Sequence, residues 1–86
     1  MTITKKIVAD KILDYLHHKI TLDELVDWSE NILIDGDFEE KNFDLIKDIT
    51  GNLGLADVRN FGLRWEDCEN FLKRLGYKVN INAEVI

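Results

Sequence analysis

The candidates for metal binding or nucleophilic chemistry are Asp14, His17, His18 and Cys68. Asp14 and His18 are four residues apart, beside His17, so both would reach one ion from the same side of a helix. Structural zinc takes four ligands, however, and histidines are also favoured at the negative end of a helix. Cys68 is the only cysteine and follows an apolar helical pattern, which predicts a packed, inert thiol. We therefore expect no metal, no cofactor and no enzymatic activity.

The segment Asp35-Gly36-Asp37 offers oxygen ligands beside a glycine, as calcium loops do. With Gly36 at the sixth position of a calcium-binding loop, the third position is Leu33 and the twelfth is Asn42. Leu33 has no side-chain oxygen, and Asn42 lacks the bidentate carboxylate that the twelfth position requires. The register that starts at Asp35 places a glutamate where the glycine belongs. We therefore interpret the segment as a turn, with Gly36 in a left-handed conformation.

The carboxylates are concentrated in one part of the chain, whose net charge is −6. Residues 20–48 contain ten acidic residues and two lysines, whereas the rest of the chain contains seven acidic and nine basic residues. This balance argues against nucleic acid as a ligand, because phosphate binding needs a positive surface. At helical spacing, the carboxylates of residues 23, 27 and 30 share one side of a helix. Those of residues 40, 44 and 48 share one side of the next helix.

Like charges at this spacing destabilise a helix, and a cationic partner would relieve their repulsion. The pattern predicts an interaction module that binds a basic protein, as small acidic immunity or antitoxin-type inhibitors cover the positive site of a toxin. That comparison rests on size and charge alone. Two alternatives stay open: a structural or regulatory homodimer whose acidic surface serves solubility, and a metal- or ligand-binding domain that uses Asp14 and His18. The predicted partner-binding residues are Asp23, Asp27, Trp28, Glu30, Asp37, Glu40 and Asp44, with Trp28 as the anchor.

Four helices are needed to position these residues. The apolar periodicity predicts helices over residues 4–18, 22–34, 38–53 and 65–75, and one short helical turn is expected within 55–63. The second helix has the clearest start, because Thr21 and Glu24 form a capping box. Asp37 followed by Glu40 is a second, weaker capping pattern, which predicts that the third helix starts at Phe38. Gly76 is expected to end the fourth helix. Both Trp28 and Trp65 are expected to pack as large residues of a small bundle.

The last ten residues change from helical to alternating periodicity, which is typical of a strand with one buried face. A single strand leaves both edges unpaired, so we expect it to pair with another chain or with residues 1–4. The predicted fold is therefore mainly α: one domain over residues 1–86, a compact bundle of four to five short helices with a C-terminal β-strand over 77–86. The predicted oligomerisation residues are Tyr77, Val79, Ile81 and Val85.

The cellular compartment is predicted from cysteine usage and from the lack of targeting or membrane-spanning patterns in the sequence. A single cysteine excludes a disulfide framework, and the chain opens without a secretory leader. No apolar run approaches the ~18 residues that a membrane span requires. We expect a cytoplasmic protein that does not enter the membrane.

Overall fold

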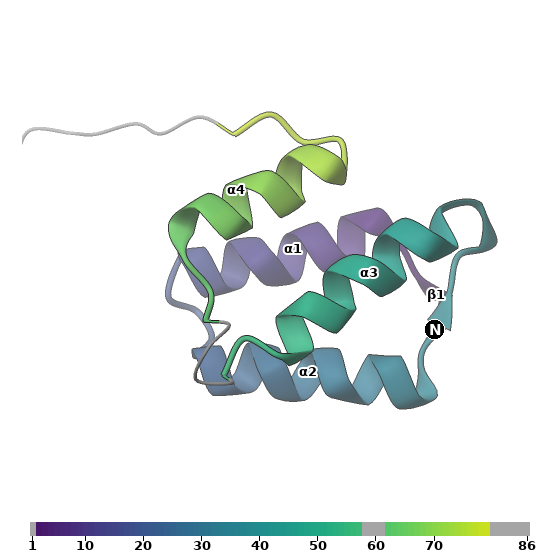
Figure 1. Ribbon diagram of the computed structural model, residues 1–86, viewed down its shortest axis with the longest axis horizontal. Helices are drawn as coiled ribbons and strands as arrows, with labels where there is room; N and C mark the ends of the chain where they lie inside the picture. Colours follow the sequence, from purple (N-terminus) through teal and green to yellow (C-terminus); the bar gives the residue numbers. More distant parts are fainter. Residues whose placement is uncertain (1, 58–61, 80–86) are drawn as a thin grey trace, which may run out of the picture.

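The computed structural model describes residues 2–57 and 62–79, and its secondary structure is mainly helical (Figure 1). The elements in chain order are β1 (Thr2–Ile3), α1 (Lys5–Leu16), α2 (Leu22–Asp35), β2 (Asp37–Phe38), the 3₁₀-helix η1 (Glu40–Asn42), α3 (Phe43–Gly54) and α4 (Trp65–Arg74). None of the helices in the described part is long and apolar enough to cross a membrane.

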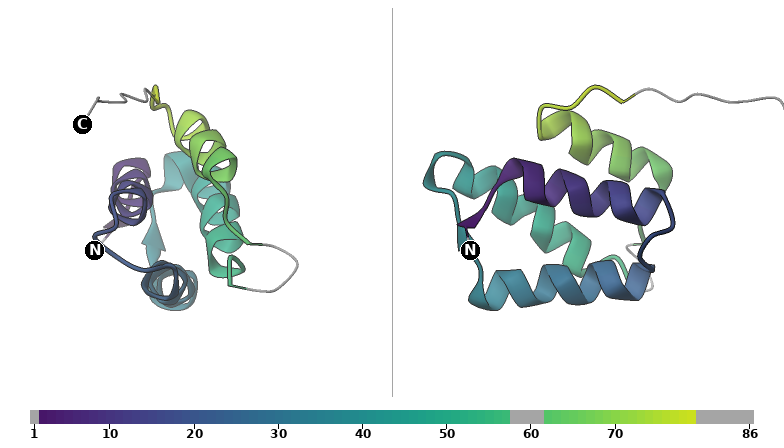
Figure 2. Two further views of the ribbon diagram at one scale, coloured as in Figure 1. Left: turned by 90° about the vertical axis from the view of Figure 1, so that its left-hand side faces the viewer. Right: turned by 180° about the vertical axis from the view of Figure 1, so that it is seen from behind.

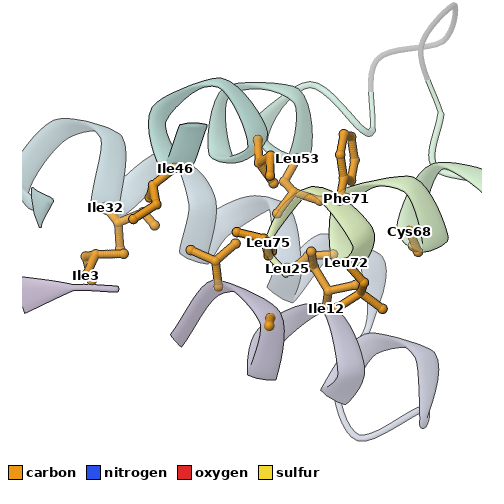
Figure 3. Packing of buried hydrophobic residues seen from close by; sticks show 13 residues of the cluster. Ile3, Ile12, Leu25, Ile32, Ile46, Leu53, Cys68, Phe71, Leu72 and Leu75 are labelled. Carbon is orange, nitrogen blue, oxygen red and sulfur yellow. The ribbon is translucent and has the colours of Figure 1, made fainter. Parts of the chain in front are cut away.

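The four α-helices surround one apolar core, and α2 runs along one edge of the molecule (Figures 1 and 2). The helix α3 crosses α2, while α1 and α4 close the core from the other side. Apolar side chains from all four helices and from β1 interlock in the middle (Figure 3). Members of this core include Ile3, Ile12, Leu25, Ile32, Ile46, Leu53, Phe71, Leu72 and Leu75.

The start of α2 follows the predicted capping box in detail. The Thr21 hydroxyl accepts the Glu24 backbone N–H at 3.1 Å, and the Glu24 carboxylate accepts the Thr21 N–H at 3.0 Å. Two of the otherwise unpaired donors of the first turn are thereby satisfied. The cap therefore fixes where the helix begins, and the buried residues Leu25, Val26, Ser29 and Ile32 set which side of α2 faces outward.

The connection from α2 to α3 differs from the prediction of a helix starting at Phe38. Asp37 and Phe38 form β2, which pairs in parallel with Thr2 and Ile3 of β1, and α3 begins only at Phe43. Pairing with β1, which is distant in sequence, outweighs the local capping pattern here. The Phe38 and Phe43 rings also pack edge to face, with centroids 5.8 Å apart.

Gly36 also differs from the prediction, because its φ of −74° is not left-handed. The glycine is needed for space. A Cβ at this position would lie 2.2 Å from the carbonyl oxygen of Ile32, so no larger residue fits without a backbone shift.

The end of α4 agrees with the prediction, because Gly76 has a φ of +93° and follows the last helical turn. The residues after it show no strand as far as they are described: Tyr77, Lys78 and Val79 lie outside any strand. Ile81 and Val85, also predicted to form the C-terminal strand, lie outside the described residues. The short N-terminal segment pairs with β2.

Candidate functional site

The outward face of α2 is the most strongly charged helix face among the described residues. The buried positions Leu25, Ser29 and Ile32 hold α2 against the rest of the bundle, so the opposite side points away from every other helix (Figure 2). Seven exposed residues occupy that side. Viewed down the helix axis, they cover a little over a third of the helix circumference. We call them the acidic face: Asp23, Glu24, Asp27, Glu30, Asn31, Ile34 and Asp35.

The carboxylates of the acidic face are not neutralised by the described part of the protein. No described lysine or arginine nitrogen lies within 4 Å of any of them, whereas four ion pairs occur on other elements. Asp27 is the most crowded, because Asp23, Glu24 and Glu30 all lie three or four residues from it. Each such like-charge pair costs about 0.2–0.5 kcal/mol of helix stability.

Ile34 is an exposed apolar side chain at the C-terminal end of the acidic face, and sequence reasoning missed it. Its side chain is 79% exposed, the largest value among the exposed large apolar residues of the described chain. A signal was present in the spacing: Ile34 follows Asp27 by seven residues, which is two helical turns, so it shares the side of Asp27. The acidic face therefore combines carboxylates with one exposed apolar contact.

Trp28, the predicted anchor, is less available than Ile34. It is half-buried and packs against the apolar core, and the Lys11 ammonium lies 5.7 Å from the centre of its ring. The tryptophan that the structure exposes is Trp65, at 38%, although its helical pattern predicted a core residue. Trp28 thus lies on α2 between the acidic face and the buried side of the helix.

The remaining predicted partner-binding residues are exposed but are not on α2. Asp37 follows the C-terminal end of α2 in β2, Glu40 lies in η1 and Asp44 lies in the first turn of α3. Since α3 begins at Phe43, Glu40 does not extend a stripe along that helix as predicted. Asp48 accepts a hydrogen bond from the Arg74 guanidinium of α4 at 2.7 Å, which neutralises part of the α3 charge.

The residues considered for metal or nucleophilic chemistry are dispersed. His17 and His18 are exposed at the end of α1, and the described residues include no group of three histidine, cysteine, aspartate or glutamate side chains that would hold an ion. Cys68 is fully buried within α4 (Figure 3). Burial, with a smaller contribution from Asp67, raises the pKa of its thiol to about 11. The thiol therefore stays protonated at neutral pH.

Comparison with protein-family models, with curated proteins and with solved structures gives no significant match.

Proposed function

We propose that the protein is an interaction module that binds a basic protein through the acidic face of α2. One observation carries this proposal: five carboxylates and an exposed isoleucine share one side of a helix, and no described basic side chain neutralises them. A surface that served solubility alone would gain stability from interspersed lysines. Because the acidic face lacks such lysines at a cost in helix stability, its negative charge is expected to have a role of its own.

The composition of the acidic face indicates how such a partner would be recognised. Carboxylates around the edge of a contact speed the encounter with a cationic surface and select against anionic ones. Ile34 supplies the apolar contact that loses water on binding, which is where most binding energy arises. The partner would therefore present lysines or arginines around an apolar depression, as expected for the target of a small inhibitor of a basic protein.

The experiment compares two double variants that change the net charge equally. In D27K/E30K the reversed charges lie on the acidic face, whereas in D10K/D57K they lie at exposed positions on other parts of the surface. Proteins from the source cells that bind immobilised wild-type protein are identified and purified. Their association rates are then measured at low and high salt. We expect D27K/E30K to slow association at least about tenfold at low salt, with a smaller effect at high salt.

The control variant D10K/D57K should retain most of the wild-type association rate. Equal loss in both variants would show that only net charge matters, and it would refute the assignment to α2. I34S provides a second arm: because this side chain is mostly exposed, its removal should leave stability unchanged and raise the dissociation rate of the complex.

A homodimer that uses the C-terminal segment is the alternative proposal. Tyr77 supports it, because this large aromatic residue is 38% exposed directly after the turn at Gly76. Light scattering across a range of concentrations tests it. The wild-type chain would have the mass of a dimer, and I81K, which places a charge in the alternating segment, would have the mass of a monomer. A monomeric mass for both proteins would exclude this alternative.

A further inference from the structure

A small pocket opens where the last turn of α1 meets the first turn of α4. These two helix ends lie side by side at the same end of the bundle (Figures 1 and 2). The aromatic residues Tyr15 and Trp65 and the apolar residues Leu16 and Leu63 belong to its lining. The pocket belongs to neither the acidic face nor the C-terminal segment.

The volume of the pocket limits the size of a ligand. It measures about 170 Å³. An apolar cavity of ~150 Å³ accommodates one benzene molecule, whereas sites for drug-sized ligands and cofactors measure ~300–1,000 Å³. The pocket is open to solvent, so any larger ligand would lie partly outside it. One planar ring with a small substituent fits.

His18 lines the same pocket in an unusual backbone conformation. Its φ of 61° is the only positive value at a described non-glycine residue. His18 follows the C-cap residue of α1, a position where glycine is the common choice. A side chain in this conformation costs free energy that glycine would avoid. The chain nevertheless places an imidazole at the pocket, which suggests that the side chain has a use there.

The charge of the lining favours an anion. The Arg64 side chain is 80% exposed, and its guanidinium is always protonated. Asp67, the nearest carboxylate, accepts the backbone N–H of Arg64 at 2.9 Å and lies 4.0 Å from the Arg64 Nε. This long contact leaves most guanidinium donors free. Cys68, which also lines the pocket, carries an uncharged thiol and adds no repulsion.

We propose that this pocket binds a single aromatic ring that carries a carboxylate. The ring would lie against Tyr15 and Trp65, and the carboxylate would pair with Arg64 near His18. The ligand is a free aromatic acid or the C-terminal aromatic residue of another chain, since both present the same groups. The proposal does not depend on the function assigned to α2.

Three probes with the same ring and different charges test the proposal: phenylacetate, 2-phenylethanol and phenethylamine. Each is titrated into the full chain while amide resonances and the Trp65 indole resonance are followed by NMR. We expect saturable shifts at His18, Arg64 and Trp65. The dissociation constant of phenylacetate should be about 1 mM. The alcohol should bind several-fold more weakly than phenylacetate, and the amine more weakly than the alcohol.

Variants separate the ring contact from the charge contact. R64Q should remove the preference for phenylacetate while binding of the alcohol is retained, and W65A should weaken both. D27K should bind all three probes as the wild type does, so failure of this proposal is distinguishable from failure of the proposed function.

The source of the carboxylate is identified with two peptides that end in phenylalanine, one with a free C-terminus and one amidated. Tighter binding of the free-acid peptide than of phenylacetate would assign the pocket to a chain end, and the reverse order would assign it to a free acid. The proposal is overturned if no probe gives saturable shifts at the pocket, if the amine binds as tightly as the acid, or if R64Q keeps the preference.

Discussion

Ser29 is a polar residue in an apolar environment. Its side chain is fully buried in α2, and its hydroxyl has no hydrogen-bond partner among the described groups. A buried unpaired hydroxyl costs about 1–3 kcal/mol, and alanine also has the higher helix propensity. We expect S29A to raise the free energy of unfolding by about 1 kcal/mol in urea denaturation. A loss of stability would mean that the hydroxyl has a partner after all.

Cys68 should make stability depend on alkaline pH. Its pKa is about 11 in the folded protein, against 9.0 for an ordinary thiol, so the folded state holds this proton more tightly than the unfolded chain. The contribution is present in full below pH 9 and is lost as the pH rises from 9 to 11. It amounts to roughly 2–3 kcal/mol.

Two measurements check the assignment of Cys68. Iodoacetamide at pH 8 should alkylate the thiol in urea but leave the folded protein unmodified. The unfolding free energy should also fall more steeply between pH 9 and 11 for the wild type than for C68A. Rapid alkylation of the folded protein would contradict the buried, protonated thiol.

At the scale of elements, substitution by alanine should change stability in opposite directions at two glycines, Gly51 and Gly36. A Cβ at Gly51 in α3 would meet no atom within 4 Å, so G51A should stabilise the helix by about 0.5–1 kcal/mol. A Cβ at Gly36 would collide with the Ile32 carbonyl oxygen, so G36A should destabilise by more than about 1 kcal/mol.

Thermal unfolding of these two variants is the direct check, since 1 kcal/mol corresponds to a shift of roughly 4–8 °C in a domain of this size. We expect the melting temperature to rise for G51A and to fall for G36A. A rise for G36A would contradict the close approach of Gly36 to the Ile32 carbonyl oxygen, and a fall for G51A would contradict the open space beside Gly51.

The helices with strong local signals could be predicted from the sequence. Thr21 with Glu24 defined the start of α2, and Gly76 defined the end of α4. The connection between α2 and α3 could not be predicted, because its conformation depends on pairing with Thr2 and Ile3, more than thirty residues away. A local capping pattern at Asp37 therefore gave the wrong start for α3.

At the scale of the whole molecule, the sequence revealed how much charge residues 20–48 carry but not how it is distributed in space. Helical spacing correctly placed Asp23, Asp27 and Glu30 on one side of α2. It did not predict that Asp48 would be paired, because Arg74 is 26 residues further along the chain. The predicted acidic surface on two helices is therefore concentrated on α2.

The central claim is that the carboxylates of α2 repel one another and that no described lysine or arginine side chain offsets this repulsion. Urea unfolding of the wild type, D27K and D48K tests it at ~10 mM and ~1 M ionic strength, where the Debye length is ~30 Å and ~3 Å. D27K replaces three like-charge neighbours with attractions, so it should be about 1 kcal/mol more stable than the wild type at low salt, with most of the gain lost at high salt. D48K loses the contact with Arg74 and should be less stable. A D27K variant that is no more stable than the wild type, or whose gain is insensitive to salt, would contradict the account.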